Sequence, residues 1–338
     1  MFRKMKTLVI VLNEYLLLVI IVALYIAAGY SIQFGFQINK MMNIRFSYLL
    51  LNIFSIFFSC IFLVIQIIRR KFNTYLNPRS IFGLLLVIAL APPFMSTFSS
   101  FKQVIPIINN FSWDYQFMKL DYILHFGHHP WEFFRLFLNY TSIIKVIDRL
   151  YMLWFPILLF SCLWMGWSSR RKLRLQFFIN ACLVWFILGT FLAIIFSSAG
   201  PCYYAKVING HPNPYEPLMS RLTEIHSSMP LFAIKNQIGI WKAYENHAWL
   251  PFGGISAMPS LHIAITVLFA LAGWRINRYV GILLAVYVLI TQVGAVILGW
   301  HYAVDGYVSI LLTIVIWKLV NKYLPLRETE FVSIDHET

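Results

Sequence analysis

The chain has 338 residues, of which 60% are hydrophobic and only 12% are charged, and its formal net charge is +14. Soluble domains carry about 25% charged residues, so this composition excludes a soluble globular protein and indicates an integral membrane protein. Three of the four cysteines, Cys60, Cys162 and Cys182, lie inside apolar runs, which argues against a disulfide framework.

In chain order, a basic N-terminus from Met1 to Lys6 precedes a long apolar run without a small-residue cleavage site, so we expect a retained first helix rather than a removed signal peptide. A transmembrane helix needs about 20 mostly apolar residues. Stretches of this kind predict eight spans, near Leu8–Tyr30, Phe46–Ile68, Ile81–Phe98, Leu150–Trp167, Leu173–Ser198, Ile255–Trp274, Tyr279–Gly299 and Ala303–Val320. The third is the least regular, because Pro92-Pro93 is expected to kink or end a helix.

The basic residues cluster on one side of the membrane when the eight spans are followed in order. The clusters are Arg3-Lys4-Lys6, Arg69-Arg70-Lys71 with Arg79, Arg170-Arg171-Lys172 with Arg174, Arg275 with Arg278, and Lys318, Lys322 and Arg327. The positive-inside rule makes this side cytoplasmic, and both termini then lie there. The net charge is therefore interpreted as membrane topology, and we expect no nucleic-acid partner.

The opposite side carries two long loops, residues 99–149 and 199–253. Within the first loop, Phe117–Gly127 predicts a helix that lies along the membrane surface. The spacing of Asp121, His125, His128 and His129 raises the alternative of a zinc site on that helix. A Gly and a Pro interrupt the helix and no cysteine assists, so we expect no metal.

Two short polar motifs interrupt the apolar pattern at the outer ends of predicted spans. Gly254–His262 reads Gly-Ile-Ser-Ala-Met-Pro-Ser-Leu-His, and Gly299–Asp305 reads Gly-Trp-His-Tyr-Ala-Val-Asp. On a helix, His301 and Asp305 share one face, so the carboxylate can orient the ring and stabilise its charged form. His262 supplies a second imidazole, and two such rings suit phosphoryl transfer: one attacks phosphorus and the other protonates the leaving oxygen.

Pro259-Ser260-Leu261-His262 resembles the Pro-Ser-Gly-His motif of the type 2 phosphatidic acid phosphatase superfamily, and His301-x-x-x-Asp305 resembles its last motif. The amino-acid sequence of both motifs is most similar to that of the branch that includes inositol phosphorylceramide synthases. The resemblance extends from Trp113 onward and implies an all-α polytopic membrane bundle with a six-helix core, preceded by extra N-terminal helices. We expect those N-terminal helices in residues 1–80, the phosphatase-like membrane domain in 81–323 and a cytoplasmic tail in 324–338.

The chain departs from the classical family pattern at the positions that supply cations. The segment Ser198–Tyr204 stands where a Lys followed after six residues by Arg-Pro is expected, and it resembles the Gly-Pro segment of the inositol phosphorylceramide synthase branch. The Arg that precedes the last motif falls at Ala295. A phosphoryl transition state needs positive charge or aligned donors, so we consider Lys206, Arg149 and Arg135 as outer-side substitutes.

Three further residues are candidates for phosphate or substrate binding. The hydroxyl of Ser260, at a helix N-terminus, would cradle a phosphate, with a plain N-cap as the alternative. Gly200 and Tyr204 would shape the pocket, with a simple turn as the alternative. The segments 121–131 and 148–156 resemble an outer segment of the same branch and are candidates for acceptor or head-group contact.

Together the motifs and the resemblance predict an enzyme at the outer leaflet that acts on a phospholipid or a polyprenyl phosphate from the bilayer. His301 would be the nucleophile, Asp305 its partner and His262 the acid and then the base, with no metal or cofactor. Discharge of the phosphohistidine to a lipid or glycan hydroxyl would make a phosphotransferase. The branch resemblance and the two missing cations favour this, because a diester carries less charge than a monoester. Discharge to water would make a lipid phosphate phosphatase, and a transporter with a proton relay is the third alternative. Nothing in the sequence indicates the oligomeric state.

Overall fold

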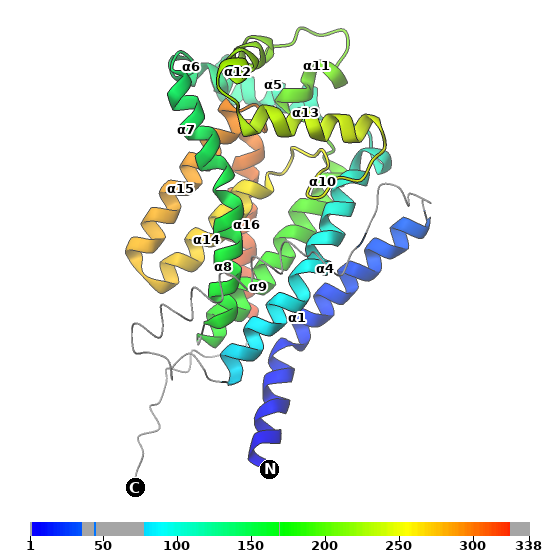
Figure 1. Cartoon of the computed structure of the whole chain (residues 1–338), viewed down its shortest axis with the longest axis vertical. Helices are drawn as coiled ribbons and strands as arrows, with labels where there is room; N and C mark the ends of the chain where they lie inside the picture. The colour runs from blue at the N-terminus through cyan, green and yellow to red at the C-terminus, as the bar shows by residue number, and fades with distance from the viewer. Residues whose placement is uncertain (1, 36–43, 45–77, 169, 325–338) are drawn as a thin grey trace.

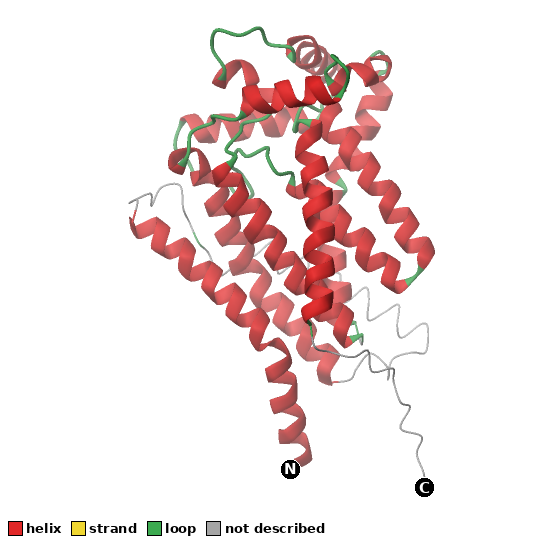
Figure 2. Cartoon of the chain, turned by 180° about the vertical axis from the view of Figure 1, so that it is seen from behind, coloured by secondary structure: helices red, strands yellow, loops and turns green. Residues whose placement is uncertain are grey.

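The computed structural model describes residues 2–35, 44, 78–168 and 170–324, and this part of the chain contains helices and no strand (Figure 2). The all-α class is therefore confirmed. The helices are α1 (Phe2–Gly35), α4 (Pro78–Ile108), α5 (Asp114–Leu124), η1 (Pro130–Phe134), α6 (Arg135–Leu138), α7 (Thr141–Met152), α8 (Trp154–Trp167), α9 (Arg171–Phe186), η2 (Ile187–Leu192), α10 (Ala193–Ile195), η3 (Pro201–Tyr203), α11 (Tyr204–Val207), α12 (Glu216–Ser228), α13 (Phe232–Glu245), α14 (Leu261–Ile276), α15 (Arg278–Ile297) and α16 (Ala303–Tyr323).

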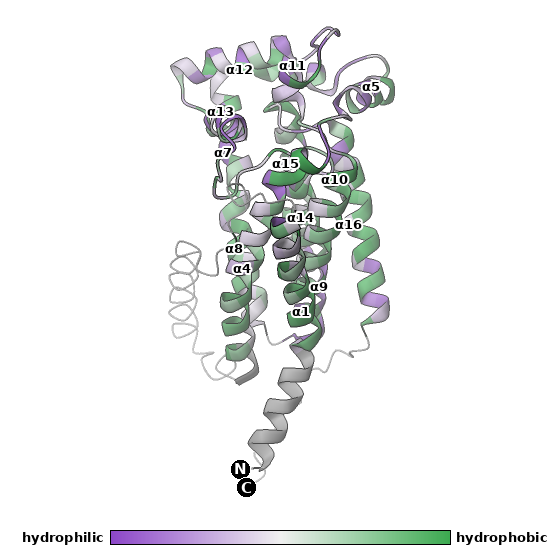
Figure 3. Ribbon diagram, turned by 90° about the vertical axis from the view of Figure 1, so that its right-hand side faces the viewer, coloured by the Kyte–Doolittle hydropathy of each residue, from purple (hydrophilic) through white to green (hydrophobic). Residues whose placement is uncertain are grey.

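Six segments of the described chain are long and apolar enough to cross a membrane. They are Tyr15–Gly35, Ile81–Ile108, Thr141–Trp167, Arg171–Ile195, Arg278–Ile297 and Ala303–Tyr323. The apolar helix α14 is shorter, at 16 residues. Hydrophobic residues dominate the body of the bundle, whereas hydrophilic residues gather at the end that is uppermost in Figure 3. The protein is therefore a multi-pass integral membrane protein, and the predicted span at Phe46–Ile68 lies outside the described residues.

The expectation that Pro92-Pro93 would kink or end the third span is wrong with respect to its end. Helix α4 continues through both prolines and through Pro106 to Ile108. Proline removes a backbone donor, but in a membrane bundle neighbouring helices and Ser or Thr side chains can compensate. Here α4 packs against α1 and α8, and the Thr97 hydroxyl donates to the Pro93 carbonyl at 2.8 Å. As a consequence, α4 extends ten residues past the predicted end at Phe98, from 98 to 108.

The centre of the bundle is formed by α9, α14 and α16, which pack against one another, while α15 packs along α14. Ile265 and Leu268 on α14 have no exposed surface. Helix α9 passes into a π-helical turn, Ile187–Leu192, before it ends. At Gly189 in this turn, an added Cβ would lie 2.5 Å from the Leu261 side chain, so the absence of a side chain lets α14 begin close to α9.

Short helices form a cap over one end of the bundle (Figure 1). The cap contains α5, α6, α11, α12 and α13, and α5 confirms the helix predicted near residues 117–127. The first described residue, Phe2, and the end of α16 at Tyr323 lie at the opposite end (Figure 1). The cap therefore covers the ends of α14 and α16 where the two polar motifs are located.

Buried carboxylates fasten the cap to the helices beneath it. Asp121 on α5 accepts hydrogen bonds from the backbone N–H groups of Ala303 and Val304, at 2.7 and 2.9 Å, and so caps the N-terminus of α16. Asp148 on α7 accepts in the same way from Phe232 and Ala233 at the start of α13. A carboxylate at a helix N-terminus satisfies donors that have no partner within the helix and complements the helix dipole.

Candidate active site

The two polar motifs meet directly under the cap. His262 is in the first turn of α14, and His301 lies in the short connection between α15 and α16. Their ring centroids are 6.4 Å apart. The fold therefore brings together two imidazoles that are distant in the sequence.

The ring of His301 is held through its Nδ1 atom. This atom lies 2.9 Å from the Ala257 carbonyl oxygen and 3.2 Å from Oδ2 of Asp305. Both partners are acceptors, so Nδ1 carries the proton and donates it, and the lone pair of the neutral ring is on Nε2. The geometry therefore leaves Nε2 as the ring nitrogen that is able to attack an electrophile.

The environment of His301 favours the neutral, nucleophilic ring. Its side chain is buried, and burial, together with a smaller contribution from the charge of Lys102, lowers the pKa of His301 to about 3. A neutral imidazole that attacks phosphorus becomes positively charged, and the carboxylate of Asp305 lies where it would stabilise that charge. The arrangement therefore favours the neutral ring and would stabilise a positive charge on it.

Backbone geometry explains why His301 is placed at this point. Gly299 has φ +71°, which is the left-handed region that glycine adopts without strain. The N–H groups of Trp300 and His301 both donate to the Ala295 carbonyl. Ala295 itself has no exposed surface. Ala295, where the resemblance placed the arginine of the classical pattern, is thus tightly packed near the end of α15, without space for a long charged side chain.

Aromatic side chains orient His262. Its ring stacks on Tyr151, with centroids 4.9 Å apart and an angle of 23°, and it also contacts Trp154 at 4.5 Å. The Trp154 indole N–H donates to the backbone carbonyl of His262 at 3.1 Å. Residues of α7 and α8 therefore hold both the ring and the backbone of His262.

Both histidines line one cavity of about 270 Å³. Most of its lining is aromatic or aliphatic, and its polar side chains are few. The lining includes Met95, Lys102, Phe155, Trp185, Phe252, His262 and His301. A concave, mostly apolar site with a few convergent polar groups is typical of a small-molecule or lipid site.

The structure places the other predicted binding residues behind this cavity. Ser260 is fully buried at the N-cap of α14, and its N–H lies 3.5 Å from the Asp305 carbonyl. Gly200, at φ +94°, packs against the Trp300 carbonyl and donates its N–H to Asp114. Tyr204 is buried against Tyr215. None of these three lines the described cavity, so they contact the walls of the site from outside.

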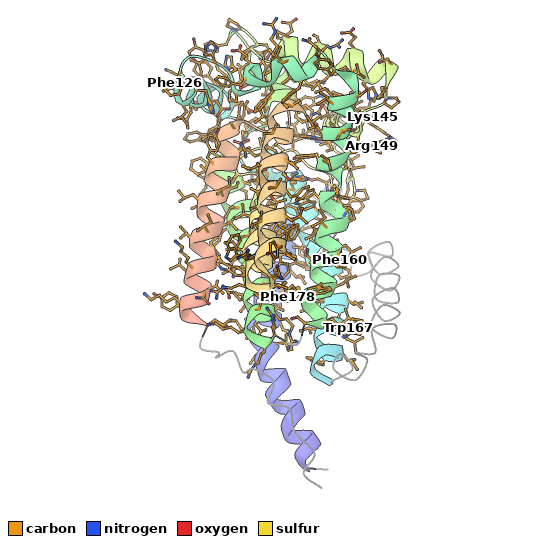
Figure 4. The ribbon with its side chains drawn as sticks, turned by 90° about the vertical axis from the view of Figure 1, so that its left-hand side faces the viewer. Phe126, Lys145, Arg149, Phe160, Trp167 and Phe178 are labelled. Atoms are coloured by element: carbon orange, nitrogen blue, oxygen red, sulfur yellow. The ribbon has the colours of Figure 1, made fainter. Side chains whose placement is uncertain are left out.

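The three cations considered from the sequence lie away from the cavity. Arg135 and Arg149 are exposed, and Arg149 projects from the outer side of α7, as does Lys145 (Figure 4). Lys206 is exposed and stacks over the Trp241 ring at 4.5 Å. Instead, the cavity is lined by Lys102 of α4, which the sequence analysis did not single out. A lysine inside a membrane-spanning helix is a functional signal, but the expected helix end at Phe98 placed Lys102 in a loop.

Asp114 is a further residue that the sequence analysis missed. It is fully buried and accepts hydrogen bonds from the N–H groups of Ala199 and Gly200, both at 2.8 Å, and from the Tyr302 hydroxyl at 2.7 Å. Burial raises the pKa of Asp114, and the three donors act in the opposite direction. This carboxylate ties the segment that replaces the first classical motif to the residue that follows His301.

The histidines of the first outer loop do not converge. His125 contacts the Asp121 carbonyl and the Tyr307 hydroxyl, and His128 lies 3.3 Å from Glu132. Within the described residues, no group of three His, Cys, Asp or Glu side chains is arranged to hold a metal ion. Asp121 and Asp148, in the segments considered for head-group contact, cap helices α16 and α13 instead.

The comparisons with known proteins agree with this geometry at the level of the family. No curated protein and no solved structure matches the chain. The family model of the PAP2 superfamily matches residues 115–319, which include both histidines and Asp305. Members of this superfamily are phosphatases or phosphotransferases that act on phosphoesters. The chain therefore belongs to the PAP2 superfamily and is an integral membrane enzyme of lipid phosphoester chemistry.

Proposed function

We propose that this enzyme is a membrane phosphotransferase that moves a phospho-headgroup from a lipid donor to the hydroxyl of a lipid or glycan acceptor through a phosphohistidine. The observation that carries the proposal is the pair of imidazoles across one cavity, with one ring held by Asp305 and the other by a stack of aromatic side chains. His301 is the nucleophile, Asp305 its positioning and charge-stabilising partner, and His262 the general acid and base.

In the first half-reaction, Nε2 of His301 attacks the phosphorus of the donor. The N–P bond forms as the P–O bond to the leaving alcohol breaks, and protonated His262 delivers its proton to that oxygen. Two rings with centroids 6.4 Å apart leave room for the phosphoryl group between them. Near-attack geometry requires reacting atoms at about 3 to 3.5 Å, and the fixed ring positions favour it.

In the second half-reaction, neutral His262 accepts the proton of the acceptor hydroxyl. The oxygen attacks phosphorus, the N–P bond breaks, and His301 returns to its neutral form. Asp305 accepts from Nδ1 throughout and stabilises the positive charge on the ring while the N–P bond exists. Each half-reaction conserves protons, and the two together return both histidines to their starting state after one transfer.

Transfer to an alcohol is favoured over hydrolysis by two observations. The cavity is lined mainly by aromatic and aliphatic side chains, which suits a lipid acceptor better than free water. In addition, the position of the classical arginine is Ala295, and a diester donor with a single negative charge needs fewer cations than a monoester.

We place the reaction at the outer leaflet. Arg275 is in the last turn of α14, at the end opposite to His262, and Arg278 is the first residue of α15. Lys318 and Lys322 are in the last two turns of α16. The positive-inside rule assigns these ends to the cytoplasm, so the capped end that holds the histidines faces outward.

The test is turnover by the purified protein in vesicles that contain a phospholipid with a labelled head group and a hydroxyl-bearing acceptor lipid. We expect a new labelled phospholipid. Release of the labelled phosphate only, without any new lipid, would replace the transferase with a phosphatase. Absence of both products with glycerophospholipids, polyprenyl phosphates and lipid acceptors would refute the enzymatic assignment of the site. His301→Ala is the inactive control, and His247→Ala, an exposed histidine on the cap, is the matched active control.

A further inference from the structure

The proposed reaction brings phosphoryl oxygens with negative charge into a cavity that needs a cation. The classical cations are absent from the sequence, and Arg135, Arg149 and Lys206 lie outside the cavity. Among the described residues that line it, Lys102 is the only Lys or Arg. In that part of the chain, Lys102 forms no ion pair with a carboxylate, so its charge is available to a ligand.

The position of Lys102 is fixed by the loop that leads into the first histidine motif. The Ser99 hydroxyl accepts from the N–H of Phe252 at 3.0 Å, and Oε1 of Gln103 accepts from the N–H of Leu250 at 2.7 Å. Gly254, at φ +101°, lies so close that an added Cβ would be 2.6 Å from the carbonyl carbon of Lys102. The C-terminal end of α4, which carries Lys102, is therefore fixed in position relative to the segment that leads into His262.

We propose that Lys102 is the residue that binds the phosphoryl oxygens of the substrate, in place of the two cations of the classical family motifs. The inference rests on the proposed function for the identity of the reaction. Lys102 lies on a helix outside residues 115–319, which the family model matches, so the family pattern does not assign it. Lys102 lines the same cavity as His262 and His301, and its charge disfavours protonation of both rings.

A phosphate bound at Lys102 also explains how His262 can be protonated when it is needed. Burial, and to a smaller extent the lysine charge, opposes a positive charge on the two imidazoles. An anionic phosphoryl group between them offsets that charge and favours the imidazolium. Proton uptake by the general acid would thus follow substrate binding, which keeps the empty site neutral at His301 and His262.

The experiment compares Lys102→Met and Lys102→Arg with Lys206→Met, a matched loss of a lysine outside the cavity. We expect Lys102→Met to lower kcat/KM by at least about 100-fold, as for loss of one transition-state donor. Lys102→Arg should retain activity within about tenfold of wild type, because the charge is kept, and Lys206→Met should match wild type. The acid limb of the kcat/KM profile should move to higher pH in Lys102→Met, because the lysine charge no longer opposes protonation of His301.

A binding measurement separates this inference from the proposed function. Orthovanadate, which imitates a pentacoordinate phosphoryl group, should raise the unfolding temperature of wild type and of Lys206→Met but not of Lys102→Met or Lys102→Gln. If wild type binds vanadate through Lys102 but turns over no lipid, the phosphate site stands and the proposed function fails. If wild type turns over lipid and Lys102→Met matches Lys206→Met in kcat/KM and in vanadate binding, the role of Lys102 is refuted.

A second inference comes from an independent feature, a cavity of about 420 Å³ inside the membrane-spanning part of the bundle. Its lining comes from α1, α4, α8 and α9 and from Phe252, and it contains no charged side chain. Met95, Phe155, Trp185 and Phe252 line both this cavity and the histidine cavity. An apolar chamber thus adjoins the reaction site along the direction of the bilayer interior.

We infer that this apolar cavity holds a hydrocarbon chain of the lipid whose phosphoester lies between His262 and His301. This inference also rests on the proposed function. The occupant follows from the shared wall: a molecule with its phosphorus at the histidines and an attached chain of methylenes fits both chambers at once. A chain gains little hydrophobic free energy on leaving the bilayer, since lipid tails are as apolar as the cavity wall. The cavity therefore positions the donor and selects its chain length more than it raises affinity.

The test fills the cavity and varies the chain. Ala91→Phe adds volume at the cavity wall, and Leu85→Phe changes an exposed position of the same helix as the matched control. We expect Ala91→Phe to lower kcat/KM about tenfold or more for dipalmitoyl donors and to leave dihexanoyl donors near the wild-type value. Equal losses for both donors, or no loss for either, would overturn the inference, whereas no wild-type turnover of either donor would refute the proposed function instead.

A measurement that needs no turnover checks the same site. A phospholipid with a diazirine at the end of its chain should label peptides from Val87–Met95 of α4 or Leu158–Leu163 of α8 after illumination. Labelling confined to the exposed face of α15, for example near Leu283 or Leu289, would show that the chain stays in the bilayer and would refute the assignment.

Discussion

Replacing Asp305 with asparagine tests the charge relationship on which the mechanism depends. The side chain keeps its size, and its oxygen can still accept from the Tyr302 N–H, which lies 3.0 Å from Oδ2 in the native protein. The Ala257 carbonyl still accepts from Nδ1 of His301, at 2.9 Å, so the tautomer is retained. The variant therefore removes the negative charge beside the ring and little else.

The expected loss follows from the distance. Nδ1 of His301 lies 3.2 Å from the Asp305 carboxylate. Two unit charges about 4 Å apart interact by about 4 kcal/mol at an effective dielectric constant of about 20. Since each 1.36 kcal/mol is about a tenfold change in rate, loss of this interaction in the transition state corresponds to about a 1,000-fold decrease in kcat. KM should change little, because the His301 ring is neutral in the ground state and interacts only weakly with the negative charge of Asp305.

The assay measures kcat and KM for the purified variant with a labelled phospholipid in detergent, together with its unfolding temperature. Asp121→Asn is the matched control, because Asp121 is also a buried carboxylate that accepts at the N-terminus of α16 but does not line the cavity. A folded Asp305→Asn protein with kcat within about fivefold of wild type would refute the view that Asp305 stabilises a charged His301.

Three further outcomes follow from the same geometry. His301→Ala should abolish turnover. His262→Ala should accumulate an alkali-stable phosphoenzyme with a donor whose leaving group needs no proton, as measured by the label retained on the protein. Label retained on His301→Ala would contradict the assignment of His301 as the nucleophile. Burial raises the pKa of Asp121 to about 7, so between about pH 4 and pH 7 the folded state binds more protons than the unfolded state. The free energy of unfolding should therefore fall as pH rises through that window. Chemical unfolding of Asp121→Asn should not show this pH dependence. Gly200→Ala would put a Cβ 2.7 Å from the Trp300 carbonyl oxygen and should lower both the unfolding temperature and the activity. Gly210→Ala, also at positive φ but in open space, should cost only about 1 kcal/mol of backbone strain and leave the activity normal. Equal losses in the two variants would contradict the packing argument.

Much of the fold was accessible from the sequence because a bilayer restricts what a chain can do. Long apolar segments must form helices, since backbone groups have no other hydrogen-bond partners in lipid. The spans predicted at Leu173–Ser198, Tyr279–Gly299 and Ala303–Val320 therefore correspond to within a few residues to α9 with η2 and α10, to α15 and to α16. The pairing of His301 with Asp305 was also accessible from their spacing, but the expectation that both lie on one helix face is wrong. His301 precedes α16, and its ring is held by Asp305 in the first turn of that helix together with the distant Ala257 carbonyl.

The end of α4 shows where such reasoning stopped. The predicted third span ended at Phe98, and Lys102 was consequently assigned to the loop at residues 99–149. In the folded protein α4 continues, since contacts with α1 and α8 offset the lost donors. Finding the one Lys or Arg that lines the histidine cavity in the described part of the chain thus depended on a helix boundary that only packing between helices determines.

Arg135, Arg149 and Lys206 show the same limit from the other direction. Charge and predicted side of the membrane made all three reasonable ligands for phosphate, but neither property states where a side chain points. The fold directs Arg149 outward from α7 and stacks Lys206 on Trp241. Similarly, the acidic residues Asp114, Asp121 and Asp148 became helix and loop anchors only because the cap folds back onto α13, α16 and the segment after α9.

The order of residues along the chain was enough to establish a helical membrane enzyme with two imidazoles and a carboxylate, because hydropathy and short-range spacing are properties of neighbouring residues. The distance between His262 and His301, the choice of Lys102 as the cavity cation and the apolar chamber beside them depend on contacts among α4, α8, α9, α14 and the cap. Such contacts join positions far apart in the chain, and their energies come from the packing of complete side-chain surfaces that no local pattern encodes.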